Sequence, residues 1–228
     1  MVDVAMNGGL TTAIGVYVLG PQLVPVVLGG ARALLRLGRI RLGVLAARSA
    51  RAGIGANANT IAPLAAAIGL TAAVLTPVRS AAATLVAAGV ASPGLNYSDT
   101  LVMSGLLAVV ALLTSVSVIV LSRGGAAREQ ALLRVAGMTP RQATSWCGWQ
   151  SGLLAICAVI LGLVPVAVAS TTIALWPMPG RGHAVVDAPW IGIGAAGLLC
   201  WAVLFAAQWV QLRPALRREP AAGLRGPT

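Results

Sequence analysis

Few residues in this sequence could do acid–base, metal or phosphate chemistry, and they are scattered. The 228 residues include five acids, one His and sixteen Arg, with no Lys. A single imidazole, His183, makes neither a metal site nor a catalytic triad, and we expect it to be an exposed loop residue. The phosphate loop of an ATPase needs a Lys, so the chain cannot hydrolyse ATP by that route. The residues therefore predict no catalytic, cofactor-binding or metal site.

The three cysteines point to packing rather than to chemistry. Cys147, Cys157 and Cys200 all lie inside apolar segments. A thiol in such a segment is most often a small buried residue, and a disulfide is not expected.

The composition places the chain in a lipid bilayer. Hydrophobic residues make up 58% of the chain and charged residues only 9%, whereas soluble domains carry roughly 25% charged residues. The net charge of +11 does not indicate nucleic acid, because aromatic residues are few and the Arg clusters flank apolar segments. The first Arg is Arg32, so no basic region precedes the first apolar segment, and we expect that segment to be retained rather than cleaved as a signal peptide.

Five uncharged windows are long enough to cross a membrane, which takes about 20 apolar residues. They run over residues 4–31, 52–78, 100–122, 142–180 and 188–212. The uncharged stretch 80–98 is predicted to be a loop, because Ser92-Pro93-Gly94 and Asn96-Tyr97-Ser98 are turn sequences. The fold class is therefore an all-α integral membrane protein with five transmembrane helices.

Arginines orient these spans, because short cytoplasmic loops carry the positive excess. Six Arg lie between the first and second windows, four between the third and fourth, and four in the tail, which is fourteen of the sixteen. Arg79 and Arg181 fall in the other loops, together with Asp99 and Asp187. The N-terminus is predicted outside and the C-terminus in the cytoplasm.

Prolines mark details of individual helices. Pro25 and Pro165 lie inside spans and predict kinks in the first and fourth helices. Pro189 suits the first turn of the fifth helix, and Pro214 is predicted to end it.

Gly148 and Gly152 have the GxxxG spacing of closely packed membrane helices. In a chain with 27 glycines, a chance match and a packing seam remain equally open.

The predicted spans contain no Asp, Glu or His. Such groups are expensive in a bilayer and are kept for function. Their absence from the spans argues against an intramembrane enzyme and against an ion-driven secondary transporter.

The second cytoplasmic segment has the pattern of a short helix between two spans. Residues 126–136 are good helix formers, and Gly137 is a natural C-terminal cap. Thr139-Pro140-Arg141-Gln142 then predicts a capping box with Pro at the first helical position of the fourth span. The apolar residues Leu132, Leu133 and Val135 suit either the membrane surface or a groove on a partner.

The run from Arg128 to Gln142 resembles the R-x-E-hydrophobic-x-LLR-x-x-G signature of FtsX-like (MacB-type) ABC transporter permeases. Residues 42–73 are similar to that family's entry into its first helix, although Gly55-Ala56-Asn57-Ala58 stands where basic residues are usual. The resemblance implies four core helices in residues 52–215 and a coupling helix at 126–137 that docks on a separate ATPase subunit. Residues 1–51 would be an extra span with an Arg-rich linker, and residues 216–228 a basic tail.

The same resemblance assigns the docking residues. Arg128, Glu129 and Arg134 would make polar contacts with the ATPase, Leu132 and Leu133 would seat the helix, and Gly137 would end it. ATP would be bound by the partner, so no cofactor is expected on this chain.

Two departures from the family pattern bear on function. Only about twenty residues, 79–99, replace the family's large extracytoplasmic domain, and an extra span precedes the four-helix unit. The chain is thus similar to the C-terminal half of a two-repeat permease, which predicts a second permease subunit in a multi-pass complex of the cell membrane. The alternative is a structural or regulatory membrane protein that binds a partner without transport. Substrate and direction of transport stay open.

Overall fold

The computed structural model describes residues 2–37, 41–52, 54–87, 98–121, 137–175, 177–178, 182–183 and 185–217. Within these residues the chain is helical apart from short connecting segments and two antiparallel two-residue strands, in which Pro177 pairs with His183. The elements are α1 (Val2–Leu37), α2 (Arg41–Ala52), α3 (Ile54–Ala87), α4 (Ser98–Leu121), α6 (Pro140–Ala174), β1 (Pro177–Met178), β2 (Gly182–His183) and α7 (Trp190–Arg217).

Each of the five predicted spans coincides with a helix: α1, α3, α4, α6 and α7. Among the described residues, three helical stretches are long and apolar enough to cross a membrane: Asn59–Val86, Pro140–Ala174 and Trp190–Val210. A bent pair within α1 makes a fourth if it is a single span. The all-α membrane fold is therefore confirmed, while the number of five spans stays a prediction.

A sharp bend divides α1. The stretches Asp3–Gly20 and Gln22–Ala33 meet at 79°. Pro25 lacks the N–H that would bond the carbonyl of residue 21, and its ring crowds that carbonyl, so a proline bends a helix about one turn before itself. The predicted kink in the first helix is thus present. In contrast, α6 runs as one unbroken helix through Pro165.

Two helices continue further than the sequence predicts. The prediction of a loop from residue 80 is wrong, because α3 extends to Ala87 and carries Arg79 inside the helix. The turn residues behind that prediction begin at Ser92, beyond the end of α3. Pro214 does not end α7, which continues to Arg217. Its missing N–H removes a single hydrogen bond close to the helix end, and three more residues stay helical.

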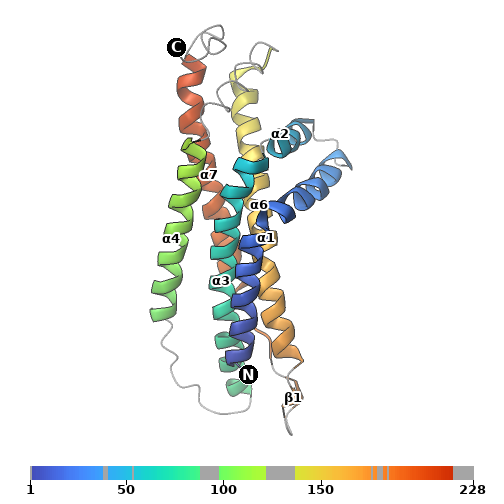
Figure 1. The fold of residues 1–228 in the computed structure, drawn as a ribbon, viewed down its shortest axis with the longest axis vertical. Coiled ribbons are helices and arrows are strands. Elements are labelled where there is room, and N and C mark those ends of the chain that lie inside the picture. Colours follow the sequence, from blue (N-terminus) through green and yellow to red (C-terminus); the bar gives the residue numbers. More distant parts are fainter. Residues whose placement is uncertain are drawn as a thin grey trace.

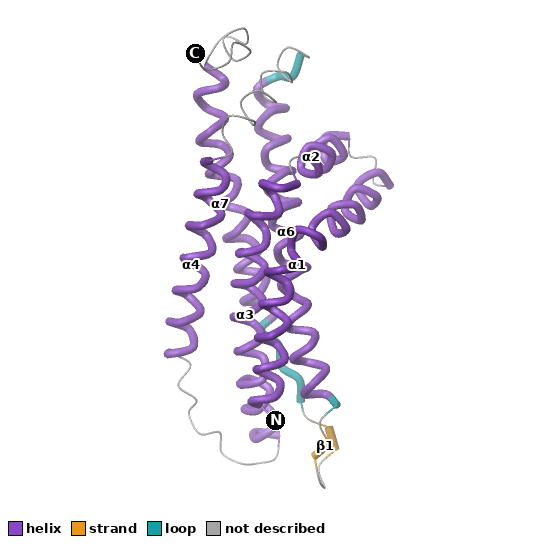
Figure 2. The backbone as a smooth tube through the Cα atoms, viewed as in Figure 1, coloured by secondary structure: helices purple, strands orange, loops and turns teal. Residues whose placement is uncertain are grey.

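The helices form an elongated bundle (Figures 1 and 2). The first part of α1 packs against α3 and α6, α7 packs against α6, and α4 lies at one side against α3 and α7. The short α2 packs against α1 and α6 near the end of the bundle opposite the N-terminus. The start of α1 and β1 lie at one end, and the end of α7 lies at the other (Figure 1).

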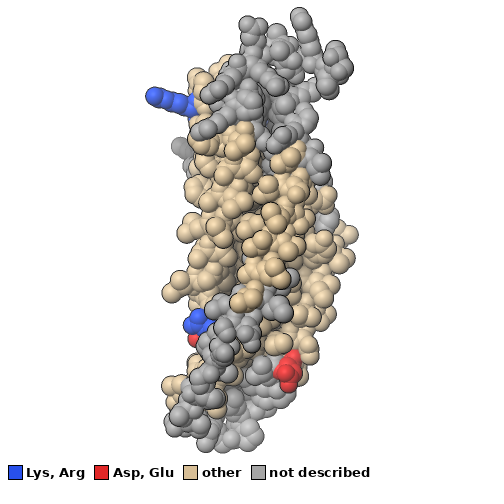
Figure 3. Space-filling model, turned by 90° about the vertical axis from the view of Figure 1, so that its left-hand side faces the viewer, with Lys and Arg blue, Asp and Glu red and all other residues tan. Residues whose placement is uncertain are grey.

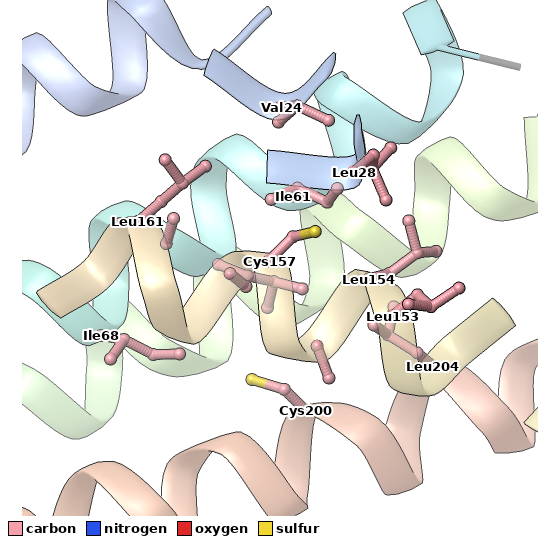
Figure 4. Packing of buried hydrophobic residues seen from close by; sticks show 14 of the residues in the cluster. Val24, Leu28, Ile61, Ile68, Leu153, Leu154, Cys157, Leu161, Cys200 and Leu204 are labelled. Atoms are coloured by element: carbon pink, nitrogen blue, oxygen red, sulfur yellow. The ribbon is translucent and has the colours of Figure 1, made fainter. Parts of the chain in front are cut away.

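The core lies where α1, α3, α6 and α7 meet (Figure 4). Leu28 from α1, Ile61 from α3, Leu154 from α6 and Leu204 from α7 are each at most 1% exposed. All three cysteines are free and buried, as predicted, and they pack as small apolar residues.

Small residues let α3 and α6 approach closely at one crossing. A Cβ atom on Gly69 would lie 2.9 Å from Pro165 Cγ, and one on Gly162 would lie 3.0 Å from Ile68 Cγ2. Small residues at such crossings are the usual means of packing membrane helices. The Pro165 ring therefore fills the space that Gly69 leaves open.

Charged side chains lie towards the two ends of the bundle on the face shown in Figure 3. Blue and red atoms appear there near the ends, and uncharged side chains fill the stretch between them. A central uncharged band with charges at both ends is the distribution that a bilayer requires.

Candidate functional site

Most of the predicted docking residues lie outside the described part of the chain. Arg128, Glu129, Leu132, Leu133 and Arg134 belong to the segment 122–136, which the structure does not describe. Gly137 is described, and its backbone has φ +90°. This left-handed conformation is the one that favours Gly at the C-terminal cap of a helix. The structure therefore places the last residue of the predicted docking segment and the start of α6.

The junction from this segment into α6 is closed by a capping box. Thr139 Oγ1 accepts a hydrogen bond from the Gln142 backbone N–H at 3.3 Å, and the Thr139 N–H donates to Gln142 Oε1 at 3.0 Å. Pro140 occupies the first turn, where its missing N–H costs nothing. The predicted capping box is confirmed. Because Gly137, Thr139 and Pro140 each fix local backbone geometry, α6 begins at a defined residue and direction.

The first turns of α6 are anchored in the bundle. Ala143, Trp146 and Cys147 are buried there, and α2 packs against α6. The indole N–H of Trp146 is buried and has no hydrogen-bond partner among the described residues. A displacement at the start of α6 would therefore be transmitted to its neighbours, because close-packed interiors transmit strain.

A polar cluster joins α6 to α7. Gln208 Oε1 accepts hydrogen bonds from Cys147 Sγ at 3.2 Å and from Ser151 Oγ at 3.0 Å. Ser151 Oγ shares its single hydrogen with the Cys147 carbonyl at 2.9 Å. The sequence did not predict this cluster, because a serine hydroxyl in a membrane helix can bond either its own backbone carbonyl or a neighbouring helix. A neutral amide inside an uncharged window is the signal that could have revealed it.

The GxxxG pair faces aromatic side chains of α7. A Cβ on Gly148 would lie 3.7 Å from Phe205, and one on Gly152 would lie 3.7 Å from Trp201 Nε1. The indole N–H of Trp201 donates to the Gly148 carbonyl at 3.4 Å. The rings of Trp201 and Phe205 stack with centroids 5.9 Å apart. Added Cβ atoms would make ordinary van der Waals contact with these rings, so the pair does not require glycine as Gly69 and Gly162 do.

An ion pair closes the opposite end of the bundle. Arg79 on α3 bonds to Asp187, which precedes α7, through Nε at 3.0 Å and Nη2 at 3.3 Å. The backbone N–H of Asp187 also donates to Ser80 Oγ at 3.0 Å, and that of Val185 donates to Thr84 Oγ1 at 3.2 Å. The segment leading into α7 is therefore fastened to the last turns of α3. The end of α3 and the start of α7 share these polar contacts.

The described residues hold no group of three or more His, Cys, Asp or Glu that could bind a metal ion. The Gln208 cluster and the Arg79–Asp187 pair each connect helices to one another. Such contacts can transmit a displacement from one helix to the next.

A family model for the FtsX-like permease C-terminal region matches residues 100–220, which is more than half of the chain. The chain belongs to this family. The matched region takes in α4, the docking segment, α6 and α7, whereas the upstream resemblance at residues 42–73 lies outside it. No curated protein and no solved structure matched the chain in the other two comparisons. Members of the FtsX-like family are non-enzymatic membrane subunits of ABC-type systems.

Proposed function

We propose that the chain is the permease subunit of an ABC transporter in the cell membrane, and that a separate ATPase subunit docks on residues 126–137. The ATPase binds and hydrolyses ATP, and the permease converts that cycle into rearrangement of its helices. The observation that carries the proposal is the family match over residues 100–220, because it includes the docking segment together with the helices on both sides of it.

The junction into α6 supports this role. A docking helix can move a membrane helix only if the connection between them is stiff. The capping box at Thr139 and the Pro at position 140 begin α6 immediately after the segment, and Gly137 turns the chain there. The 35 residues of α6 then run to Ala174 without a break. A push on residues 126–137 would therefore move α6 as a rod.

The neighbours of α6 extend the movement to the rest of the bundle. The cluster of Cys147, Ser151 and Gln208 fastens α6 to α7, and the Gly69–Pro165 contact fastens it to α3. The Gly69–Pro165 contact is buried, and the hydrogen bonds to Gln208 are partly buried. We infer that α3, α6 and α7 shift together when the ATPase changes state.

The proposal includes an orientation and a second membrane subunit. The Arg-rich ends of the helices, the docking segment and the tail 216–228 face the cytoplasm, and the Arg79–Asp187 pair faces outward. Only residues 88–97 separate α3 from α4. Because this connection leaves no room for a large outer domain, a second permease subunit, identical or different, completes the complex.

The same short connection favours one alternative function. A permease without an outer domain could act as a structural or regulatory membrane protein that binds a partner without transporting cargo. The two functions differ in the partner, because only the first one requires an ATPase.

The test is copurification with an ATPase from native membranes, followed by measurement of ATP hydrolysis. Arg134→Glu reverses a charge in the docking helix, and it is expected to reduce both complex formation and stimulated hydrolysis several-fold. Arg48→Glu is the matched control, because Arg48 is an exposed Arg on α2 at the same end of the bundle. This control should leave both readouts at the wild-type level.

Two results would contradict the proposal. Arg134→Glu and deletion of residues 126–137 could both leave complex formation and hydrolysis unchanged, which would exclude the docking role. Copurification of a partner without a nucleotide-binding domain would favour the regulatory alternative.

A further inference from the structure

A long apolar groove lies between α3, α4 and α7, away from the docking segment. Its volume is about 330 Å³. The floor includes buried side chains of Leu64, Ala72, Ile193 and Cys200. Among the described lining residues, Thr71 supplies the one side-chain hydroxyl, and the others are Gly, Ala, Pro, Cys, Leu or Ile. A ligand of this groove must therefore be apolar along its length.

The groove is elongated along the helix axes. Its lining runs along α3 from Leu64 to Leu75 and along α7 from Pro189 to Cys200. Eleven residues of helix rise by about 16 Å. One leaflet of a bilayer has a hydrocarbon thickness of about 15 Å, half of the roughly 30 Å core. The groove thus has the length of a single lipid tail in one leaflet.

Two charged side chains lie just beyond one end of the groove. Arg79 follows Leu75 by one helical turn, on the same face of α3, and Asp187 precedes Pro189 by two residues. The two side chains pair at 3.0 Å, and they are 44% and 39% exposed. Arg79 bonds to Asp187 through Nε and Nη2, and its Nη1 has no further acceptor among the described residues, so its two N–H donors can bind another group. A half-exposed pair of opposite charges complements a headgroup that itself carries both charges.

We propose that this groove binds one acyl chain of a zwitterionic bilayer phospholipid, whose phosphate lies at Arg79 and whose ammonium lies at Asp187. The lipid acts as a wedge between α4 and α7, which otherwise meet mainly through α3. The proposal goes beyond coupling to an ATPase and does not depend on it, because it requires only that α3, α4 and α7 lie in a bilayer.

The first test uses phosphatidylethanolamine with a photoreactive diazirine in its acyl chain, added to the full-length protein in vesicles of the same lipid. After irradiation, peptide mapping should find labels in residues 64–75 and 189–200 several-fold above those on the exposed face of α4. Equal labelling of all apolar surfaces would overturn the proposal, because it would show bulk lipid only.

Filling the groove should remove the label. Gly105 lines the groove, and a Cβ atom there would meet no atom within 4 Å, so Gly105→Leu places a side chain in the groove without moving the backbone. Gly194→Leu is the matched control, because Gly194 also has open space around it and does not line the groove. Labelling should fall several-fold in the first variant and stay unchanged in the second. If labelling fell equally in both variants, or stayed unchanged in both, the result would contradict lipid binding in the groove.

A second lipid probe tests the assignment of the headgroup. The same experiment with a phosphatidylglycerol probe, which lacks the ammonium, should label the groove several-fold more weakly. Asp187→Asn should abolish this preference between the two lipids. Equal labelling by both probes in the wild type would overturn the assignment of the headgroup.

A third arm identifies the occupant in cells. A diazirine-bearing amino acid at position 112, which lines the groove from α4, should form an adduct with the mass of a phospholipid. An adduct with a second copy of the chain or with another polypeptide would overturn the proposal.

Discussion

The side-chain carbonyl of Gln208 joins α6 to α7, because it accepts hydrogen bonds from Cys147 and Ser151. In a bilayer neither donor can turn to water instead, so the bonds persist as long as the helices stay together. Hydrogen bonds between membrane helices contribute about 0.6 kcal/mol on average and at most about 1.7 kcal/mol. The cluster therefore positions α7 more than it stabilises the protein.

At this scale we predict that Gln208→Leu lowers the free energy of unfolding by about 1 kcal/mol, because two donors lose their acceptor. Unfolding with a denaturing detergent in mixed micelles measures the change. A double-mutant cycle with Ser151→Ala should give a coupling of about 0.6 kcal/mol. Gln150→Leu is the control, since Gln150 on α6 makes no such bond among the described residues. A coupling near zero would exclude the bond.

Single residues were only partly predictable from the sequence. The three buried thiols and the Thr139 capping box follow from local context, and the structure confirms both. The pairing of Arg79 with Asp187 could not be predicted, because it joins residues 108 positions apart. It depends on where α3 and the segment before α7 come together, which no local pattern encodes.

Close crossings between helices set the geometry of individual elements. At the α3–α6 crossing, Gly69 faces the Pro165 ring and the carbonyl of Gly162, at 2.9 and 3.3 Å from an added Cβ. Neither the ring nor the backbone carbonyl can turn away like a flexible side chain. The two helices therefore hold their separation only with Gly at position 69.

We predict that Gly69→Ala destabilises the protein by about 1–3 kcal/mol, the usual cost of overpacking a core. Gly194→Ala is the control, because its Cβ meets open space, and it should gain up to about 1 kcal/mol from the better helix propensity of Ala. The same unfolding experiment gives both values. Changes of opposite sign in the free energy of unfolding would support the close approach of α3 and α6 at Gly69. No change in the Gly69→Ala variant would contradict it.

Helix ends were less predictable than helix positions. The uncharged windows located all five long helices, because the bilayer imposes a length and a composition. The end of α3 was predicted too early, since Ser80 and Thr84 accept hydrogen bonds from the distant residues Asp187 and Val185. The extension of α7 past Pro214 was not predicted. Proline in the middle of a helix usually breaks it, whereas near a helix end it removes only one hydrogen bond.

The whole molecule is an elongated bundle in which α1 starts at one end and α7 finishes at the other (Figure 1). At 35 residues, α6 is about 52 Å long, which exceeds the roughly 40–45 Å of a bilayer with its headgroups. We therefore expect Arg141 near its start and Val186 beyond its end to lie on opposite sides of the membrane.

We predict that Val186→Cys reacts with a membrane-impermeant maleimide in intact cells, and that Arg141→Cys reacts only after permeabilisation. Both residues are exposed, and the three native cysteines are replaced by Ala in the background. This outcome follows from the Arg-rich loops facing the cytoplasm. Labelling of position 141 alone in intact cells would reverse the orientation proposed above.

At this scale the sequence indicated the family and the class of fold, since both rest on local runs of residues. The groove between α3, α4 and α7 could not be predicted, because it arises from how three helices pack. Its described lining consists of small and aliphatic residues that are common throughout the apolar windows, so only the assembled bundle distinguishes it.

Site-specific photocrosslinking from the docking segment tests the central claim most directly. A photoreactive amino acid at Leu132 in the full-length chain in cells should form an adduct with a subunit that carries a nucleotide-binding domain. The same group at Leu113, which is 63% exposed on α4, should capture only lipid. An ATPase adduct from position 132 and none from position 113 is the predicted result. Failure to capture an ATPase from any position between 128 and 134 would contradict the account.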